Sequence, residues 1–133
     1  MTFRVVNPPG LGAPRGFNHG MLAPAGGRIL FVAGQPAIDP DGEVRAAGFV
    51  DQFDVALARV MAVVREAGGG AEHVGRMTVY VLDMGEYERS RPALAGVWRR
   101  HMGTHYPAMA LVEVAALVDA GAVLEIEATA VVP

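Results

Sequence analysis

The chain has 133 residues, which predicts a single domain because a second independent core would not fit. Hydrophobic residues make up 52% and charged residues 19%, so a disordered protein is excluded, and the absence of Cys excludes disulfides, thiolate nucleophiles and Cys-ligated metal sites. The net charge of −3, the absence of Lys and the lack of any basic run longer than Arg99-Arg100 argue against nucleic acid as a partner.

The first part of the chain is predicted to hold short strands between irregular segments. Residues 3–6 form a predicted edge strand, and residues 7–16 form an irregular loop because they contain three Pro and three Gly. Residues 28–33 are predicted to be a buried strand that contains Ile29, Leu30, Phe31 and Val32. Turn chemistry follows at Asp39-Pro40-Asp41-Gly42.

Residues 48–67 are predicted to form an amphipathic helix that ends before Gly68, a residue suited to the left-handed cap position. The apolar stripe behind this prediction consists of Val50, Phe53, Leu57, Val60, Met61 and Val64. Residues 74–82 then alternate in polarity, which predicts a strand with two different faces. One face carries Met77, Val79 and Val81, and the other carries Arg76, Thr78 and Tyr80.

A second helix is predicted to begin at Asp83, which forms a capping-box pattern with Glu86. Pro92 lacks a backbone donor, so we expect a break near Ser90, with Ser90 as a cap and Pro92 in the first turn of the next piece. The expected buried face consists of Tyr87, Leu94, Val97, Trp98 and Met102.

Two strands are predicted to close the chain, over residues 109–117 and 122–132, with a hairpin-length link at residues 118–121. The resulting order is β–β–β–α–β–α–β–β. Strands outnumber helices in this order, which predicts an α+β domain with its helices on one face of the sheet.

The usual catalytic and metal-binding patterns are missing. Ser90 is the only Ser and lacks a Gly-x-Ser-x-Gly elbow, so a catalytic triad is not expected. The four His (19, 73, 101 and 105) do not form a metal signature, because Gly103 interrupts the helix between the last two, and we expect surface or interface positions for them. No metal or cofactor is therefore expected.

We expect a cytoplasmic protein that does not contact a membrane. No apolar run approaches the roughly 20 residues of a membrane span, and the first residues lack the apolar region of a signal peptide. The apolar content is high for a chain of 14.0 kDa, which indicates that part of it is buried between subunits.

A set of short segments follows in order from about residue 7 to residue 132. The N-terminal half holds Asn7-Pro8-Pro9-Gly10-Leu11, Gly16-Phe17-Asn18-His19, Val32-Ala33-Gly34-Gln35 and Asp39-Pro40-Asp41-Gly42. The rest of the chain holds Thr78-Val79-Tyr80-Val81, Pro107-Ala108, Val112-Glu113-Val114 and Glu125-Ile126-Glu127-Ala128. This ordered set resembles the reactive intermediate deaminase family, also called the RidA, YjgF or L-PSP endoribonuclease-like family.

The resemblance implies a chorismate-mutase-like (YjgF/L-PSP) α+β fold over residues 1–133, with a mixed, mainly antiparallel sheet and two helices packed on one face. It also implies a homotrimer with ligand clefts between neighbouring subunits, which would bury the surplus of apolar residues. Active members of the family hydrolyse enamines and imines, such as 2-aminoacrylate, to 2-keto acids and ammonia.

The resemblance assigns a catalytic role to Glu125, whose carboxylate helps to position the attacking water. It places Phe17, Asn18 and Glu113 in the substrate pocket, with Phe17 standing where the family has a Tyr. Met109 occupies the position of the Arg that binds the substrate carboxylate, and a thioether cannot form that ion pair.

Other residues are candidates to replace the missing Arg. Arg15 lies next to the Gly16-Phe17 segment, and Arg91, Arg99 and Arg100 lie on the second helix, although each is more often a solvated surface residue. Arg91 or Ala95 lies nearest to the position of an Asn that the family carries on this helix. The neighbouring His105 and Tyr106 offer other polar groups. A pocket lined by Met109, Phe17 and Trp98 would favour a more apolar ligand.

The leading hypothesis is a homotrimer that binds a small metabolite between subunits and hydrolyses enamine or imine intermediates, with Met109 disfavouring 2-aminoacrylate as the substrate. The alternative is a non-catalytic trimer that binds or senses a small molecule. The endoribonuclease or translation-inhibitor activity attached to parts of the family is disfavoured, because phosphate contacts need a basic surface.

Overall fold

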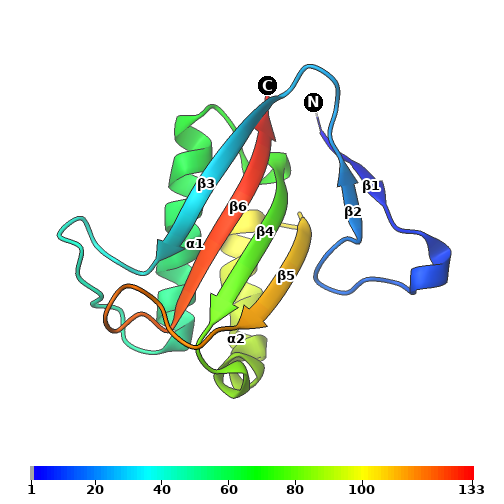
Figure 1. The fold of residues 1–133 in the computed structure, drawn as a ribbon. Helices are drawn as coiled ribbons and strands as arrows, with labels where there is room; N and C mark the ends of the chain where they lie inside the picture. Colours follow the sequence, from blue (N-terminus) through cyan, green and yellow to red (C-terminus); the bar gives the residue numbers. More distant parts are fainter. Residues whose placement is uncertain (1) are drawn as a thin grey trace.

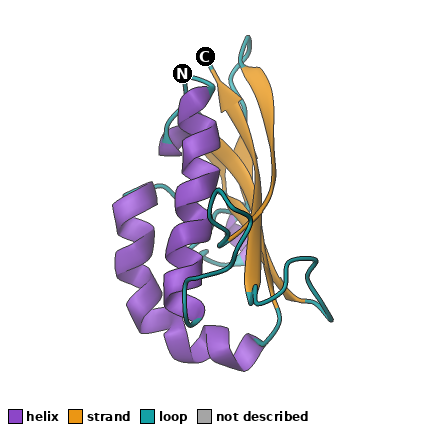
Figure 2. Cartoon of the chain, turned by 90° about the vertical axis from the view of Figure 1, so that its left-hand side faces the viewer, coloured by secondary structure: helices purple, strands orange, loops and turns teal. Residues whose placement is uncertain are grey.

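Two helices cover one face of a four-stranded sheet in the computed structural model, which describes residues 2–133 (Figures 1 and 2). The strand order is β3 (Arg28–Pro36), β6 (Leu124–Val132), β4 (Val74–Val81), β5 (Ala108–Glu113). The β4–β5 pair is parallel and the other two pairs are antiparallel. The predicted element order and the α+β class are confirmed.

The core lies between the sheet and the two helices. The predicted alternation of β4 is confirmed on its helix-facing side, where Met77, Val79 and Val81 are fully buried. β6 alternates in the same way, and its buried residues Leu124, Ile126 and Ala128 complete the floor of the core. The opposite side of the sheet carries no helix, so the residues between these positions face outward (Figure 2).

Helix α1 (Phe49–Glu66) buries the predicted stripe from Phe53 to Val64, and Val50 packs against the core while partly exposed. The Gly68 N–H donates to the Arg65 carbonyl and the Gly69 N–H donates to the Val64 carbonyl, with Gly68 at a φ of 89°. This pair of bonds is a Schellman motif, so the predicted glycine cap is confirmed.

Helix α2 (Met84–Met102) runs through Pro92 without a break, so the predicted interruption near Ser90 is wrong. Pro92 is exposed, and water can therefore satisfy the carbonyl of Glu88 that loses its helical partner. Ser90 is not a cap, because its hydroxyl donates to the Glu86 carbonyl inside the helix at 2.8 Å. The predicted cap at Asp83 is confirmed, since its carboxylate accepts from the Glu86 N–H at 3.2 Å.

Two strand predictions need correction. β3 is not buried on both faces, because it is an edge strand whose outward side chains Ile29 and Phe31 are 64% and 78% exposed. The last two strands do not form a hairpin, because β4 lies between β5 and β6 in the sheet. β5 ends at Glu113 and β6 begins at Leu124, and the connection between them is correspondingly longer than predicted.

The N-terminal segment lies beside the β5 edge (Figure 1). Its strands β1 (Arg4–Val6) and β2 (Gly20–Leu22) form a small antiparallel pair around the short helix η1 (Pro9–Leu11). Asn18 joins this segment to β5, because its side-chain amide donates to the Tyr106 carbonyl at 2.6 Å and its N–H donates to the Pro107 carbonyl at 3.1 Å. Asn7 holds Asn18 in turn by donating to its Oδ1 at 2.8 Å.

Within residues 2–133, no helix is long and apolar enough to cross a membrane.

Candidate functional site

A cavity of about 250 Å³ opens between α2 and the β5 edge of the sheet. We call it the helix-side cavity. Its lining is mostly apolar and aromatic, and consists of Gly16, Phe53, Val79, Tyr87, Arg91, Leu94, Ala95, Trp98, Tyr106, Met109 and Leu111. Concave apolar sites with a few polar groups are typical of small-molecule binding. Of the predicted site residues, this cavity brings together Met109 and Trp98.

Helix periodicity explains how α2 contributes to the helix-side cavity. Tyr87, Arg91, Ala95 and Trp98 share one face of the helix, because they follow one another at spacings of three or four residues. Arg91 and Ala95, the two candidates for the position of the family's Asn, both line the cavity. The same face of the helix carries residues that the sequence predicts to be buried, and Arg91 falls on it whereas Arg99 and Arg100 do not. This pattern could have identified Arg91 as the arginine that lines the cavity.

The position of Met109 follows from strand pairing. Met109 lies opposite the buried Met77 of the neighbouring β4 and therefore faces the helices, where it packs against the core while partly buried. The cavity therefore has an apolar thioether in its wall at the position where the resemblance expects a guanidinium.

Two aromatic rings fix the rim of the helix-side cavity. The Trp98 and Tyr106 rings stack with a centroid distance of 5.8 Å and an interplanar angle of 6°. The Trp98 indole N–H donates to the His105 carbonyl at 3.2 Å, which ties the helix to the segment that leads into β5. Trp98 is buried, and its stacking on Tyr106 together with the indole hydrogen bond holds this side of the cavity in place.

Arg91 is the only residue with a formally charged side chain at neutral pH among those that line the helix-side cavity. Its Nη1 lies 3.3 Å from the Glu88 Oε2, and both side chains are more than half exposed. Exposed ion pairs of this kind contribute only about 0–1 kcal/mol. The guanidinium is therefore free to exchange Glu88 for another carboxylate at low cost.

Phe17 and Asn18 line a different cavity, of about 330 Å³, which also borders β5. Its other lining residues are His19, Arg76, Ala108, Met109 and Ala110. Arg76 lies opposite Ala108 on the face of the sheet away from the helices. The expected single pocket of Met109, Phe17 and Trp98 is thus divided in two, and only Met109 borders both parts.

Glu125 lies on the outward face of β6, in register with Tyr80 of β4. Met109 lies in the register row of Met77, which comes three residues (about 10 Å) before Tyr80 on β4, and it faces the opposite side of the sheet. Within one chain, the structure therefore does not bring Glu125 and Met109 together. Gly34 has no side chain and therefore leaves room for the Glu125 carboxylate, since a Cβ at residue 34 would clash with the Glu125 Oε1.

Burial raises the pKa of the Glu125 carboxyl, and the nearby carboxylates of Asp119 and Glu127 raise it further. Glu127 itself accepts a hydrogen bond from the Tyr80 hydroxyl at 2.7 Å, and that bond raises the pKa of Tyr80. The outward face thus holds a carboxylate that takes up a proton more readily than an ordinary Glu.

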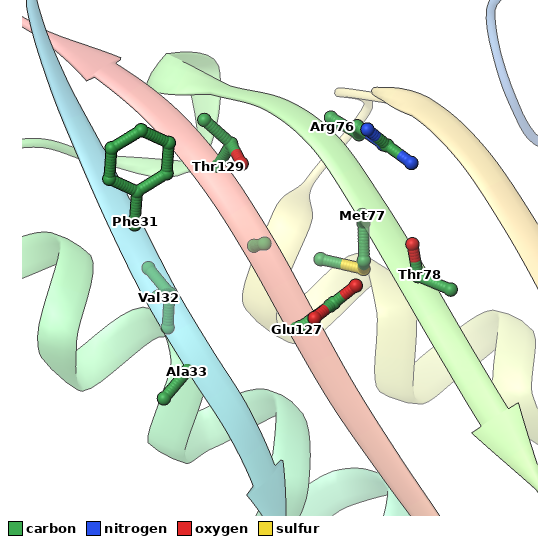
Figure 3. A pocket seen from close by; sticks show the side chains of 9 residues that line it. Phe31, Val32, Ala33, Arg76, Met77, Thr78, Glu127 and Thr129 are labelled. Atoms are coloured by element: carbon green, nitrogen blue, oxygen red, sulfur yellow. The ribbon is translucent and has the colours of Figure 1, made fainter.

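The same face is hollowed by a groove of about 390 Å³ over β3, β6 and β4 (Figure 3). We call it the outer groove. Phe31 stands at one side of it, and Glu127 points across it toward Thr78. The Arg76 side chain runs from β4 away from β6, toward β5.

Two predicted site residues lie elsewhere. The Glu113 carboxylate accepts from the Met84 N–H at 2.9 Å, so it caps the start of α2 and does not line either cavity. Arg15 is exposed and also lines neither cavity, although its neighbour Gly16 borders the helix-side cavity.

No group of three or more His, Cys, Asp or Glu within residues 2–133 is arranged to hold a metal ion. His73, for which a surface or interface position was expected, is instead buried within its own chain in the short helix η2 (Ala71–His73), where its Nδ1 accepts from the Gly70 N–H at 2.9 Å. His101 hydrogen-bonds to Asp54 at 2.6 Å.

Comparisons with known proteins place these features in a family context. The family model described as Endoribonuclease L-PSP matches residues 11–132. The RutC family protein y4sK of Sinorhizobium fredii is 38% identical over 103 residues, which cover 77% of this chain and 78% of that protein. A 2-iminobutanoate/2-iminopropanoate deaminase of Capra hircus is 31% identical over 105 residues, which cover 78% of this chain and 73% of that protein.

Among solved structures, a similar one is YyfB of Yersinia pestis, described as a protein of unknown function of the conserved Rid family. It matches this chain with a TM-score of 0.85 and 31% identity, over 99% of this chain and 100% of that one. This likeness confirms the fold that the sequence resemblance implied.

Proposed function

Because this chain belongs to the RutC/Rid (Endoribonuclease L-PSP) family, we propose that it binds a small metabolite at the β5 edge and hydrolyses an imine or enamine. The observation that carries the proposal is the helix-side cavity, in which Met109, Trp98 and Arg91 meet at the β5 edge of the sheet. A relative named as an imine deaminase supports the choice of reaction.

The proposed reaction needs only water and a carboxylate. The water oxygen bonds to the imine carbon, the carbon–nitrogen bond breaks, and the products are a ketone and ammonia. Glu125 takes a proton from the attacking water and passes it to the imine nitrogen, which gives a carbinolamine. The same carboxylate then moves the hydroxyl proton to the amine so that ammonia leaves and the carbonyl forms, a role to which its raised pKa is suited. An enamine reaches the same path after its carbon is protonated.

The location of Glu125 requires a second copy of the chain. Glu125 lies on the outward face of the sheet and does not line the helix-side cavity of its own chain. We therefore propose a homotrimer in which the Glu125 of one subunit completes the cavity of its neighbour. The exposed Ile29 and Phe31 beside the outer groove support this assembly, because apolar side chains on an uncovered sheet face favour burial in an interface.

Light scattering tests the assembly. We expect the mass of three chains, and we expect Phe31→Glu to shift the protein toward the 14.0 kDa monomer. Val118→Glu is the matched control, because Val118 is 97% exposed and lies in a loop. A wild-type monomer, or a Phe31→Glu variant as fully assembled as the control, would contradict the shared site.

Imine hydrolysis is tested by generating 2-imino acids with an amino acid oxidase and following their conversion to 2-oxo acids. We expect the wild-type protein to accelerate this conversion and Glu125→Gln to lose the acceleration. An unaccelerated conversion by the wild type for every imine tested would leave the alternative, a trimer that binds a small molecule without turnover. We expect 2-aminoacrylate to be the poorest substrate. Its carboxylate is the main group through which a protein could bind it, and Met109 stands in place of the Arg that would bind that carboxylate.

A further inference from the structure

We propose that the ligand of the helix-side cavity is a carboxylate with a bulky apolar side chain, aromatic in the best case, and that Arg91 of α2 binds its carboxylate. This inference rests on the proposed function only for the choice of this cavity as the binding site. It assigns to Arg91 a specificity role that compensates for Met109.

The wall of the cavity selects the apolar part of the ligand. Four of its eleven lining residues are the aromatic side chains Phe53, Tyr87, Trp98 and Tyr106, and Leu94, Met109 and Leu111 add aliphatic surface. Aromatic rings prefer to stack on or meet the edges of other rings. A ligand with only a methyl or hydroxymethyl side chain would leave most of this surface in contact with water.

Met109 has a direct part in this selection. An arginine at this position would place a charge in the wall, opposite the buried Met77. The thioether instead extends the apolar wall formed by Val79 and Leu111, which pair with each other two residues farther along the strands, and methionine sulfur packs well against aromatic rings. At the position where the family's Arg would bind a carboxylate, Met109 instead forms part of the surface that contacts the apolar group of the ligand.

Arg91 supplies the charge from the other side of the cavity. It lies one helical turn after Tyr87 and one turn before Ala95, so the guanidinium emerges at the rim between two lining positions. The small Ala95 leaves the entrance open. Glu88 is the only ion-pair partner described for Arg91, at 3.3 Å and on an exposed surface, and a ligand carboxylate can replace it.

The two ends of the cavity therefore fit one class of ligand. A single carboxylate meets Arg91 at the rim, and an apolar ring enters between α2 and β5. A second charge on the ligand would find no partner among the lining residues. The volume of about 250 Å³ limits the ligand to a small metabolite, because drug-sized ligands occupy sites of roughly 300–1,000 Å³.

Trp98 provides a direct reading of ligand binding, because it is the only Trp in the chain and lines the cavity. Titrations of the intact protein, followed by Trp98 fluorescence and confirmed by calorimetry, would use 3-phenylpropanoate, its uncharged amide and propanoate. We expect 3-phenylpropanoate to bind at least tenfold more tightly than either of the other two compounds. The proposal would be overturned if 3-phenylpropanoate bound no more tightly than its amide, or no more tightly than propanoate. It would also be overturned if 3-phenylpropanoate showed no detectable binding.

Variants separate the two parts of the proposal. Arg91→Met should weaken the binding of 3-phenylpropanoate about tenfold or more while leaving the amide unaffected, since a charge-assisted bond is lost. Arg91→Lys should restore part of the loss. Arg65→Met is the control, because Arg65 is an exposed residue in the last turn of α1 and lines no part of the cavity. An unchanged affinity in Arg91→Met would refute the role of Arg91.

Ala95→Phe tests the cavity itself. Ala95 is exposed at the rim, so a larger side chain can be accommodated without disturbing the core but would close the entrance. We expect this variant to lose 3-phenylpropanoate binding while keeping the wild-type melting temperature. Retained binding by a folded Ala95→Phe protein would place the ligand elsewhere and overturn the inference.

The failure of this inference and that of the proposed function are distinguishable. Hydrolysis of short-chain imines with no preference for an aromatic side chain and no change of KM in Arg91→Met would refute the ligand class and leave the reaction in place. Tight, Arg91-dependent binding of 3-phenylpropanoate without hydrolysis of any imine would support the ligand class and remove the reaction.

Discussion

Gln52 is a buried amide that joins three separate segments of the chain. Its Nε2 donates to the carbonyls of Ala46 at 3.2 Å and Gly121 at 3.0 Å, and its Oε1 accepts from the Val123 N–H at 2.9 Å. The Gln52 side chain is 3% exposed, and the three hydrogen bonds that it makes are partly buried. Gln52 therefore fixes the loop before α1 and the start of β6 against the helix.

Replacement of Gln52 by Leu is expected to lower the free energy of unfolding by about 2–3 kcal/mol, because it removes three hydrogen bonds and leaves partly buried backbone groups without partners. Urea denaturation would measure the change. Glu66→Gln, at the exposed end of the same helix, should change stability by less than about 0.5 kcal/mol. A Gln52→Leu variant as stable as this control would show that water replaces the lost bonds.

Glu125 links stability to pH in the direction opposite to that of most carboxylates. Its pKa is raised in the folded chain, chiefly by burial, so the folded state binds more protons than the unfolded state between the ordinary and the raised pKa. The contribution of Glu125 to the free energy of unfolding is therefore fully present at low pH, and it is lost as the pH rises from the ordinary to the raised pKa. Ionised Glu125 therefore destabilises the folded chain at neutral pH, and Glu125 is the residue that the proposed reaction uses as its proton acceptor.

Glu125→Gln should consequently melt at a higher temperature than the wild type at pH 7, and the difference should disappear as the pH is lowered to about 4. Melting temperatures of both proteins between pH 4 and pH 8 would measure this effect. A difference that stays constant over the whole range, or a less stable variant at pH 7, would show that the carboxylate does not carry this cost.

Helix α2 holds a proline in its interior. Pro92 leaves the Glu88 carbonyl without its helical donor, and its ring crowds the preceding turn. Pro92→Ala is expected to raise the free energy of unfolding by about 1–3 kcal/mol, with Ala93→Gly as a calibration that should lower it by about 1 kcal/mol on the same exposed face. Denaturant titrations of both variants would test this, and a destabilised Pro92→Ala protein would contradict the explanation.

Sequence patterns located the elements whose signal is local. The stripe of α1 and the alternation of β4 each lie within one segment, and both predictions are confirmed. Pro92 misled the prediction because the local rule against an interior proline was outweighed by the packing of Leu94, Val97 and Trp98 on the core. The supposed hairpin was wrong because strand pairing is not local, and the order along the chain does not state that β4 separates β5 from β6.

The candidate site was predictable to the same extent. Met109 and Trp98 were expected to lie together and do line one cavity, whereas Phe17 lies in another because Asn18 anchors its segment beyond the β5 edge. Among Arg15, Arg91, Arg99 and Arg100, only Arg91 lines the helix-side cavity, and helix periodicity carried without a break through Pro92 would have selected it from the three on α2. Glu125 and Met109 could not be placed relative to each other from one sequence, because they lie on opposite faces of the sheet.

The division of the site between two faces of one sheet has a consequence for assemblies that mix two variants of the chain. If a neighbouring subunit supplies Glu125, each active site takes its cavity from one chain and its carboxylate from another. A chain with a blocked cavity can then still supply its carboxylate to a neighbour, and a chain without the carboxylate can still provide a cavity that its neighbour completes. Closed cyclic assemblies with head-to-tail contacts generate this pattern.

Glu125→Gln and Ala95→Phe are each expected to abolish imine hydrolysis when pure, and an equal mixture, unfolded and refolded together, should recover activity. About a quarter of the sites in randomly mixed trimers would pair an open cavity with an intact Glu125, which sets the expected recovery near one quarter of wild type. Pure variants refolded in the same way, and a mixture left unexchanged, are the controls. If the refolded mixture stays inactive although wild-type protein regains its activity after the same treatment, both groups must come from a single chain, and the interface would not form the site.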